Sequence, residues 1–393
     1  MRVLQICSKP PVPSVDGGCK AANNITEGLL SNNIDVKVLT ISTDKHPFLK
    51  EKMSDEYIKK TQIENCYIDT KLKPLTALLN LCRSESYNLS RFYCRKFEEI
   101  IISTLTENKY DVVFLEGLFV SGYIKAIRKK TDVKIVFRAH NVEHEIWERN
   151  TQNERKRLKK AYLRKLAEQL KEQEVLLLNN VDAIASITEK DKTQFKLLGC
   201  KKEISVIPFG INLSDYNTGA TESQFSFFHI GSMDWMPNQM GIKWLIENVW
   251  SKVVVGNENI KLKLAGKNMP DWLINIKAKN VEVLGEVDDA IDFINTNQVM
   301  VVPLFSGSGM RVKIIEGMAL GKTVIATNIA LEGINVEHNK NVIIANTEDE
   351  FVNAINWCIN NKKEAKLIGE NALQLIKNKY DNNLIIKDLI KLF

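Results

Sequence analysis

Residues 305–327, FSGSGMRVKIIEGMALGKTVIAT, bring small residues, two cations and a carboxylate into one short segment. The small residues follow the apolar run VMVVPLF, so their backbone amides can face an anion at the end of a strand. Arg311 and Lys313 are two positions apart, and such residues do not share one stripe of a helix. We therefore expect at least one of them at the junction between the loop and the helix.

These residue types meet the needs of a diphosphate leaving group. Its negative charge grows as the bond to the departing group breaks, so it requires cations and the amides of a helix N-terminus. Glu316 cannot serve that purpose, but its oxygens can accept hydrogen bonds from the vicinal hydroxyls of a ribose. We predict a nucleoside diphosphate here, bound also by Ser308, Gly309 and Met310 of the loop. The alternative is a surface helix with ordinary charges.

Two glycine turns follow strand-like runs elsewhere in the chain. Gly17 and Gly18 lie in VDGGCK, before a helix that we expect to begin near Lys20, where backbone N–H groups can approach a phosphate. Gly231 and Ser232 in FHIGSMDW take the same place in the second half of the chain. We expect all four turn residues to contact the bound nucleotide. The alternative is plain turn chemistry, because the spacing matches neither a Walker loop nor G-x-G-x-x-G.

A third polar cluster, FRAHNVEHEIWERN, follows the apolar run VKIVF and contains Arg138, His140, Asn141, Glu143 and His144. Several polar groups at the carboxyl end of one strand favour contact with a sugar or the handling of a proton. The alternative is a buried histidine with a structural role. His140 is the stronger candidate of the two histidines, and we expect Asn141 to contact the same ligand.

Short apolar runs rich in β-branched residues alternate with longer helical patterns throughout the chain, which is typical of doubly wound parallel sheets. The strands expected in the first half are RVLQI, DVKVLTI, YDVVFLE, VKIVFRA, VDAIASI and ISVIPF. Those expected in the second half are FSFFHIG, IKLKLAG, VEVLGEV, VMVVPLF, KTVIAT and NVIIA. Six strands in each half predict two separate sheets.

The fold class is therefore α/β, with two Rossmann-like domains that face each other across a cleft. Periodicity lapses and small polar residues gather at 210–224, which indicates the break between the domains. We place one domain at 1–213 and a second at 214–375. A C-terminal helix at 376–393 is expected to return to the first domain.

Composition limits the class of protein. With 393 residues, 44% hydrophobic and 26% charged, the chain is long enough for two domains. A net charge of +6 is too small for a dedicated nucleic-acid binder and favours anionic ligands, so no nucleic-acid partner is expected. The seven cysteines form no C-x-x-C pair, and no apolar stretch approaches 18 residues. We expect a cytoplasmic protein without a bound metal.

One helix is predicted across residues 149–180. Between 151 and 175 it carries eight Lys or Arg residues against four Glu, a local charge of +4. A solvated helix face is the plain interpretation. The sharper interpretation is a contact of 149–175 with an anionic membrane surface, which would make the protein peripheral on the inner face of the plasma membrane.

Four segments together resemble the retaining glycosyltransferases of the GT-B fold, glycosyltransferase group 1 type. They are PSVDGGCKAANN, RAHNVE, VIPFGINLSDY and SGSGMRVKIIEGMALGKTVIAT, in that order along nearly the whole chain. The resemblance implies sugar transfer from a nucleotide-diphosphate sugar with retained anomeric configuration, without a metal or another cofactor. It makes 1–213 the acceptor-side domain and 214–375 the nucleotide-sugar-binding domain. It also implies that Gly17 and Gly18 lie near the diphosphate and acceptor, that His140 lies near the C6 hydroxyl of the donor sugar, and that Glu316 holds the ribose.

The chain departs from the family pattern in two places. Ser308 stands where many members have a first glutamate that contacts the donor sugar. The turn GSMDWMPNQMG lacks the Arg and Lys that many members carry there, and we infer that Arg311 and Lys313 replace them. The departing phosphate oxygen would then take the acceptor proton on the same face of the sugar.

The acceptor class stays open between a glycan, a lipid-linked oligosaccharide and a glycoprotein, as in surface polysaccharide assembly. Two other functions also stay open. One is a nucleotide-sugar epimerase of the same fold. The other is a non-catalytic partner subunit that binds a sugar nucleotide, because the first glutamate is absent.

Overall fold

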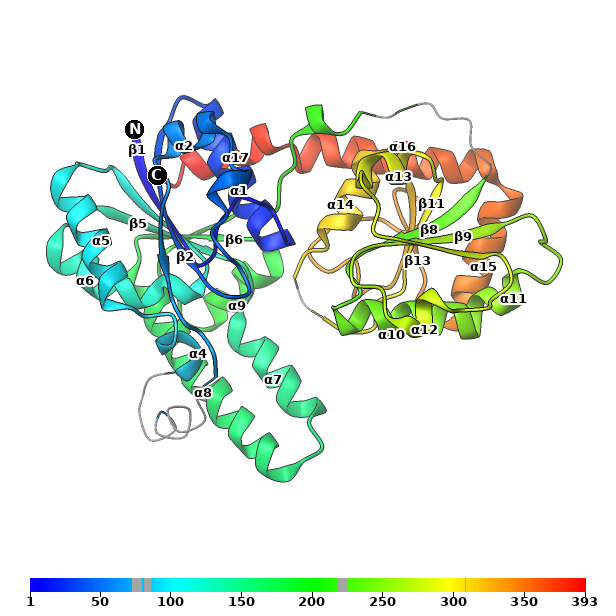
Figure 1. Cartoon of the computed structure of the whole chain (residues 1–393), viewed down its shortest axis with the longest axis horizontal. Helices are drawn as coiled ribbons and strands as arrows, with labels where there is room; N and C mark the ends of the chain where they lie inside the picture. Colours follow the sequence, from blue (N-terminus) through cyan, green and yellow to red (C-terminus); the bar gives the residue numbers. More distant parts are fainter. Residues whose placement is uncertain (73–79, 81–85, 218, 220–224, 308) are drawn as a thin grey trace. The chain divides into compact units, whose positions relative to one another are not determined.

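The computed structural model describes residues 1–72, 80, 86–217, 219, 225–307 and 309–393. The chain divides into two compact units, each built around one parallel sheet (Figure 1). The N-terminal unit comprises Met1–Gly210 and Asn382–Phe393, and the C-terminal unit comprises Ile211–Asp381. Within the described ranges, no helix combines the length and the apolar character needed to cross a bilayer.

The N-terminal unit contains a seven-stranded sheet of order β3-β2-β1-β4-β5-β6-β7. The strands are β1 (Arg2–Cys7), β2 (Asp35–Ser42), β3 (Glu64–Tyr67), β4 (Val112–Glu116), β5 (Lys134–Ala139), β6 (Ala183–Ser186) and β7 (Glu203–Val206). All six expected runs form strands, but the expected number was wrong because β3 adds a seventh. Only Cys66 of this edge strand is buried, so ENCY lacks the apolar run that marks the other strands.

Helices cover the N-terminal sheet. They are α1 (Gly17–Ser31), η1 (Lys50–Lys52), α2 (Asp55–Thr61), α4 (Tyr87–Ser90), α5 (Arg95–Glu107), η2 (Leu118–Tyr123), α6 (Ile124–Lys130), α7 (Glu143–Asn153), α8 (Arg157–Asn180), α9 (Glu189–Leu197) and α17 (Asn382–Ile390). Strands β1 and β4 are buried on both faces, as parallel strands between helix layers must be. The strand order reverses between them, and Cys7 pairs with Glu116 there. Such a switch point is where open α/β sheets bind ligands.

The prediction of a single helix over 149–180 was wrong, because α7 and α8 form a helical hairpin. The backbone is extended at Glu154 and Lys156, which ends one helix before the other begins. The packing of α7 against α8 outweighs the continuous helical pattern of the sequence. The carboxylate of Glu174 in α8 accepts hydrogen bonds from the backbone N–H groups of Glu143 and His144, at 3.0 and 3.3 Å, and so fixes the start of α7.

The C-terminal unit contains a six-stranded sheet of order β10-β9-β8-β11-β12-β13. Its strands are β8 (Ser226–Ile230), β9 (Lys261–Ala265), β10 (Val281–Gly285), β11 (Val299–Val302), β12 (Thr323–Ala326) and β13 (Ile343–Ile344), and all six were predicted. Its helices are η3 (Leu213–Asp215), α10 (Met236–Trp244), the π-helical η4 (Leu245–Trp250), α11 (Ser251–Val253), α12 (Asp271–Ile274), α13 (Ala290–Asn295), α14 (Val312–Ala319), α15 (Glu348–Asn360) and α16 (Lys362–Lys379). Here the strand order reverses between β8 and β11, so the segments that follow these two strands flank the switch point.

The chain passes from the N-terminal to the C-terminal unit at 210/211 and returns at 381/382. The sequence predicted these boundaries at 213/214 and 375/376. Two contacts set the positions. Ile211 forms an isolated bridge with Asp381 in the C-terminal unit, and its N–H donates to the carbonyl of Tyr380 at 2.9 Å. Helix α16 continues to Lys379 because Ile376 is buried within that unit.

Helix α17 packs in the N-terminal unit, beside α1. The Asn382 amide donates to the Asn24 carbonyl at 2.7 Å, and Ile385 and Ile386 join the apolar cluster on one face of the sheet. Gly28 of α1 permits this close approach. A Cβ atom at Gly28 would lie 2.4 Å from Ile386 Cγ1 and 2.8 Å from Asn382 Nδ2.

We predict that Gly28→Ala destabilises the N-terminal unit, because the added methyl group must push α17 away from α1. Overpacking of this kind costs about 1–3 kcal/mol. Differential scanning calorimetry should show a lower melting temperature for the unit. Gly122→Ala is the matched control, because a Cβ there would make an ordinary contact with Tyr93 at 3.8 Å. Equal melting temperatures for the two variants would contradict this account of the α1–α17 contact.

Candidate functional site

The ammonium group of Lys313 is the centre of the polar site in the C-terminal unit. Lys313 lies in the first turn of α14, and its Nζ is 2.8 Å from Asn238 Oδ1 and 3.1 Å from His229 Nε2. Both of these partners are neutral. Burial, with a smaller contribution from the nearby Arg311, lowers the pKa of Lys313 to about 7.

His229 holds Lys313 through a defined tautomer. Its Nδ1 lies 2.8 Å from the carbonyl oxygen of Val301, which can only accept, so Nδ1 carries the proton. Nε2 then presents its lone pair to Lys313. Burial, together with the adjacent lysine charge, lowers the pKa of His229 well below its usual value and keeps the ring neutral. Strands β8 and β11 therefore position the lysine through one histidine.

Gly231 and Ser232 shape the other side of this lysine. A Cβ atom at Gly231 would lie 2.9 Å from Lys313 Nζ, so a larger residue would displace the ammonium group. The carbonyl of Ser232 accepts from Asn238 Nδ2 at 2.7 Å, which turns the Asn238 oxygen toward Lys313. The Ser232 hydroxyl donates to Asp234 at 2.5 Å. The turn after β8 thus supports the cation through its backbone.

Arg311 is the residue that immediately precedes α14, at the junction between loop and helix. It is buried, its guanidinium lies 5.3 Å from the centre of the Trp235 ring, and Nη1 donates to the Gly309 carbonyl. Gly307 and Gly309 have φ angles of +112° and +81°, which side chains disfavour. Glycines therefore allow the loop to fold back over Arg311.

The remaining predicted residues of this segment are Met310, Ser308 and Glu316. Met310 is partly exposed just before Arg311, and Ser308 lies outside the described residues. Glu316, one turn into α14, accepts a hydrogen bond from the Tyr216 hydroxyl at 3.0 Å. Tyr216 is buried next to the short helix η3. This bond holds the Glu316 carboxylate in one orientation.

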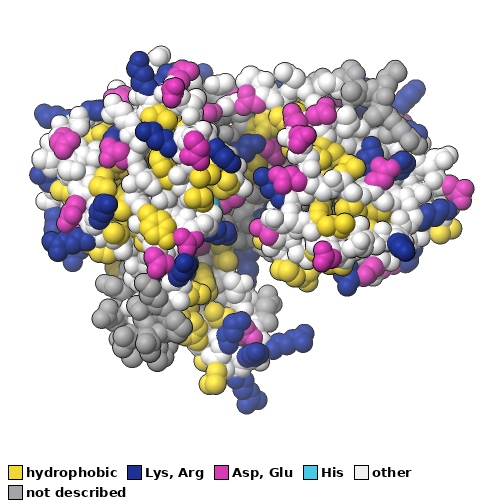
Figure 2. Space-filling view, viewed as in Figure 1, with side chains coloured by type: hydrophobic (Ala, Val, Ile, Leu, Met, Phe, Trp, Pro, Cys, Tyr) yellow, Lys and Arg dark blue, Asp and Glu magenta, His cyan; other side chains and the backbone are white. Residues whose placement is uncertain are grey.

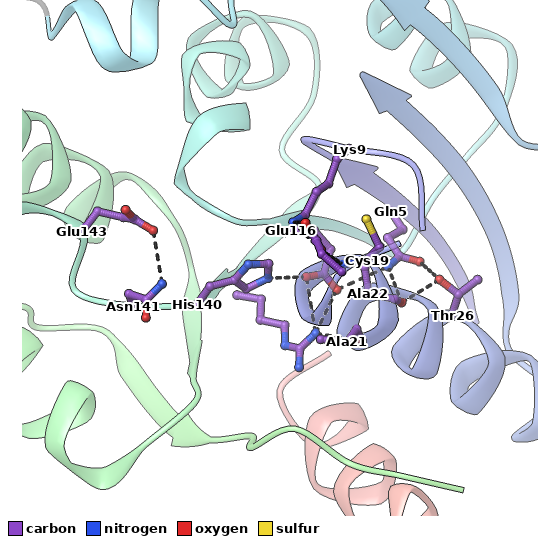
Figure 3. A network of polar contacts seen from close by, with 12 residues as sticks. Gln5, Lys9, Cys19, Ala21, Ala22, Thr26, Glu116, His140, Asn141 and Glu143 are labelled. Carbon is purple, nitrogen blue, oxygen red and sulfur yellow. Dashed lines mark hydrogen bonds and ion pairs between the residues drawn. The ribbon is translucent and has the colours of Figure 1, made fainter. Parts of the chain in front are cut away.

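The N-terminal unit has a polar network around Glu116, at the end of β4 (Figure 3). The buried carboxylate accepts from His140 Nε2 at 2.8 Å, from Arg138 at 3.4 Å and from Gln5 at 3.3 Å. Burial alone would raise the pKa of Glu116, but Arg138 and His140 outweigh it and hold the pKa below its usual value. The network therefore contains a permanent carboxylate.

This carboxylate sets the proton position on His140. An ionised Glu116 only accepts, so His140 Nε2 carries a proton and donates it to this carboxylate. The His140 side chain is 22% exposed, and a Cβ atom at Gly117 would lie 3.6 Å from Nδ1. His144 differs, because it is buried against Glu174 with its Nδ1 at 2.6 Å. His144 is thus a structural residue, and His140 is available to a ligand.

Asn141 and Glu143 lie beside His140 at the end of β5 (Figure 3). The Asn141 amide is 3.4 Å from the Glu143 carboxylate. Burial, and then the negative charge of Glu174, raise the pKa of Glu143 to about 7. Glu143 can therefore exist in either protonation state near neutral pH.

Gly17 and Gly18 form the first turn of α1, which begins at Gly17 and not near Lys20 as predicted. Asp16 caps this helix, and its carboxylate accepts from the Cys19 N–H at 2.8 Å. Lys9 Nζ lies 2.7 Å from the same carboxylate. A Cβ atom at Gly18 would lie 2.6 Å from Lys9 Nζ, so the glycine makes room for the lysine.

Asp16, Cys19 and His46 are a group of potential metal ligands in the part of the chain that the structure describes. The Asp16 carboxylate already accepts from Lys9, from His46 at 2.9 Å and from the Cys19 backbone. Lysine therefore provides the positive charge that a metal would bring. We interpret the group as the capped start of α1. Its members are too scattered in the sequence for spacing to predict it.

The sequence of the chain matches two glycosyltransferase family models. The model of Glycosyltransferase Family 4 matches residues 15–215, more than half of the 393-residue chain. The chain belongs to glycosyltransferase family 4. The model described as Glycosyl transferases group 1 matches residues 224–361 of this glycosyltransferase family 4 member.

Solved structures of similar shape share the two-sheet architecture. They include sucrose-phosphate synthase from Thermosynechococcus elongatus (TM-score 0.72, 15% identity, covering 100% of this chain and 98% of that one). Anabaena HepE in complex with UDP is also similar, with a TM-score of 0.69 and 14% identity, covering 100% of this chain and 99% of that one. A trehalose-6-phosphate synthase studied for glycosyl transfer with retention is similar too, with a TM-score of 0.63 and 14% identity, covering 99% of this chain and 98% of that one. The family 4 chain therefore has the GT-B fold, as predicted.

Two curated proteins are distant relatives in sequence. An uncharacterised protein of the cps region of Klebsiella pneumoniae is 27% identical over 169 residues, 40% of this chain and 43% of the relative. The capsular polysaccharide biosynthesis glycosyltransferase CapH of Staphylococcus aureus is 22% identical over 236 residues, 58% of this chain and 62% of CapH. The chain thus spans less than two thirds of either relative.

Sequence reasoning missed several residues that orient the glycosyltransferase site residues. His229 and Asn238 hold Lys313, Tyr216 holds Glu316, and Glu116 holds His140. His229 and Glu116 are each near the end of a predicted strand, and this position was a usable signal. The contacts themselves join residues 24 to 100 positions apart, and no local pattern predicts them.

We predict that Lys313 makes stability depend on pH. Its folded pKa of about 7 lies below the ordinary lysine value of 10.5, so between these values the unfolded chain binds more protons. The free energy of unfolding should therefore rise with pH in this window. Compared with that of Lys313→Met, the free energy of unfolding of the native protein should be lowest below about pH 7. The two free energies should approach each other near pH 10.

Urea unfolding at several pH values measures this difference. Lys243→Met is the matched control, because Lys243 is an exposed residue on α10 of the same unit. A stability difference between the native protein and Lys313→Met that is constant from pH 6 to 10 would show that Lys313 is not desolvated.

Proposed function

We propose that the chain is a retaining glycosyltransferase. It moves a sugar from a nucleotide-diphosphate sugar to a glycan, lipid-linked or glycoprotein acceptor in surface polysaccharide assembly. The observation that carries this proposal is the partly buried ammonium of Lys313, whose two hydrogen-bond partners, His229 and Asn238, are neutral. A desolvated cation beside Arg311 is best stabilised by an anion such as a diphosphate.

The donor assignment also draws support from proteins of similar fold. HepE binds UDP and UDP-glucose in its solved complexes, and CapH is a glycosyltransferase of capsular polysaccharide biosynthesis. Retention of configuration is proposed on the same basis, from the trehalose-6-phosphate synthase of this fold. The hexosyl or N-acetylhexosaminyl character of the transferred group is part of the proposal.

Each polar group in the C-terminal unit then has a role. Arg311 and Lys313 bind the diphosphate, together with the backbone amides of Gly309, Met310 and the start of α14. Glu316 accepts hydrogen bonds from the ribose hydroxyls, with Tyr216 fixing its orientation. The loop that carries Ser308 contacts the donor sugar through its backbone, in place of the missing glutamate.

The N-terminal unit supplies contacts to the transferred sugar. His140 keeps Nε2 on Glu116 and, with its side chain 22% exposed, offers Nδ1 for a hydrogen bond with a sugar hydroxyl. Glu116 is a positioning residue, because it fixes the tautomer of His140. Gly17 is exposed at the start of α1 and can approach the acceptor or phosphate, and Gly18 makes room there for the cationic Lys9.

The chemical step follows from these roles. The bond between the anomeric carbon and the phosphate oxygen breaks first, and the electron pair stays with the diphosphate. Arg311 and Lys313 stabilise the charge that develops on it. The acceptor hydroxyl attacks the same face of the sugar, and its proton moves to the departing phosphate oxygen. No side chain needs to act as a base.

We predict that the cations matter more for turnover than for folding. A screen of UDP, GDP and other nucleotides by thermal shift identifies the base, since ligand at 100 times its Kd stabilises by about 2.7 kcal/mol. With the sugar donors of that nucleotide, Arg311→Ala and Lys313→Ala should each lose roughly 10²–10³ in turnover. Glu316→Gln and Tyr216→Phe should mainly raise the donor KM.

Melting temperatures measured on the same samples separate lost rate from lost fold. Near-normal turnover in folded Arg311→Ala and Lys313→Ala proteins would refute the diphosphate assignment. Conversion of the donor to another nucleotide sugar without any acceptor would identify an epimerase. A donor that binds but is neither transferred nor hydrolysed would indicate a non-catalytic binding subunit.

We also predict that transfer needs no metal ion, because Arg311 and Lys313 already provide the charge on the diphosphate. Activity should be unchanged after treatment with EDTA and gel filtration. Product formation measured by mass spectrometry checks this directly. Complete loss of transfer, restored by added magnesium or manganese, would overturn the metal-free mechanism.

A further inference from the structure

The α7–α8 hairpin extends beyond the sheet of the N-terminal unit and ends in a basic tip (Figure 1). We define the hairpin tip as residues 154–165. Between 155 and 165 it contains seven cations and no acidic residue: Arg155, Lys156, Arg157, Lys159, Lys160, Arg164 and Lys165. Figure 2 shows Lys and Arg side chains gathered at the end of this projection.

Most of this charge is not neutralised within the protein. Lys159 pairs with Glu154 at 2.6 Å and Lys165 approaches Glu168 at 3.7 Å. In the described part of the chain, no carboxylate pairs with Arg155, Lys156, Arg157 or Arg164. The hairpin tip therefore presents concentrated positive charge to an external partner.

An apolar side chain lies among these cations. Leu158 is 89% exposed, in the first turn of α8. One turn further on, Tyr162 and Leu163 pack against the buried pair Tyr87 and Leu166, and Trp147 of α7 packs against the same pair. This cluster anchors the hairpin tip to α7, so Leu158 and the cations are displayed on a fixed support.

We propose that the hairpin tip binds the surface of an anionic lipid bilayer. The cations contact lipid phosphates, and Leu158 enters the boundary between headgroups and acyl chains. Nucleic acid and acidic glycans offer the same negative charge, but neither offers an apolar layer for an exposed leucine. The combination of unpaired cations and Leu158 therefore favours the bilayer. The proposal goes beyond sugar transfer and does not depend on it.

Vesicle sedimentation tests the proposal with the full-length protein. Binding to phosphatidylglycerol-containing vesicles should exceed binding to pure phosphatidylcholine vesicles and should fall as salt rises, because exposed charges are screened. Replacing Arg155 and Arg157 with Gln should lower the partition coefficient roughly fivefold for each cation removed. The charge-matched control is Lys129→Gln with Lys130→Gln, on exposed positions of α6.

Leu158→Ser tests the apolar contact. Leu197→Ser is its matched control, because Leu197 is 77% exposed at the end of α9. We expect Leu158→Ser to weaken vesicle binding several-fold and Leu197→Ser to leave it unchanged. Melting temperatures should stay the same for all four variants.

The outcomes separate the competing partners. Equal binding to anionic and neutral vesicles, or none, would overturn the proposal. Binding that depends on the arginines but not on Leu158 would also overturn it, and would indicate an acidic polymer as the partner. Sugar transfer to a soluble acceptor is measured in parallel, so a failure of the enzymatic proposal remains distinguishable.

Discussion

The placement of the partly buried Lys313 between two neutral partners is the constraint on which the C-terminal unit depends. A desolvated ammonium group is costly, and the cost appears in its lowered pKa. Strand β8 supplies His229, β11 supplies the Val301 carbonyl that fixes the His229 ring, and α10 supplies Asn238. Gly231 leaves the space that the ammonium occupies. These elements meet at the switch point of the sheet, and all of them converge on one unneutralised cation.

At its own switch point, the N-terminal unit holds a buried negative charge instead of a cation. There a buried carboxylate, Glu116, is surrounded by three donors from β1, β5 and the segment after β5. The charge is satisfied internally, so this network orients a residue and does not require an external ion. The contrast explains why we assign binding of the diphosphate to Lys313 and Arg311, and only orientation of a sugar contact to Glu116 and His140.

The sequence predicted twelve of the thirteen strands because each of these lies in a short run rich in apolar and β-branched residues. Strand β3 lies at an edge and buries only Cys66, so it leaves no such run. The break between α7 and α8 was missed because the helical pattern continues through Glu154, where the backbone is extended. The contact of Glu174 with the start of α7 joins residues 31 positions apart, so no local pattern predicts it. Residue types at strand ends predicted the charged groups of the site, but not the partners that hold them.

The most direct test of the account is the uptake of protons when a nucleoside diphosphate binds. Isothermal titration calorimetry at about pH 8, in buffers of different ionisation enthalpy, measures this quantity. Free Lys313, with a pKa of about 7, is mostly neutral at that pH and should gain close to one proton beside the diphosphate. Lys313→Arg, which is always charged, should bind without uptake. Uptake of about one proton by the native protein alone is the predicted result, and binding without any uptake would contradict the central role of Lys313.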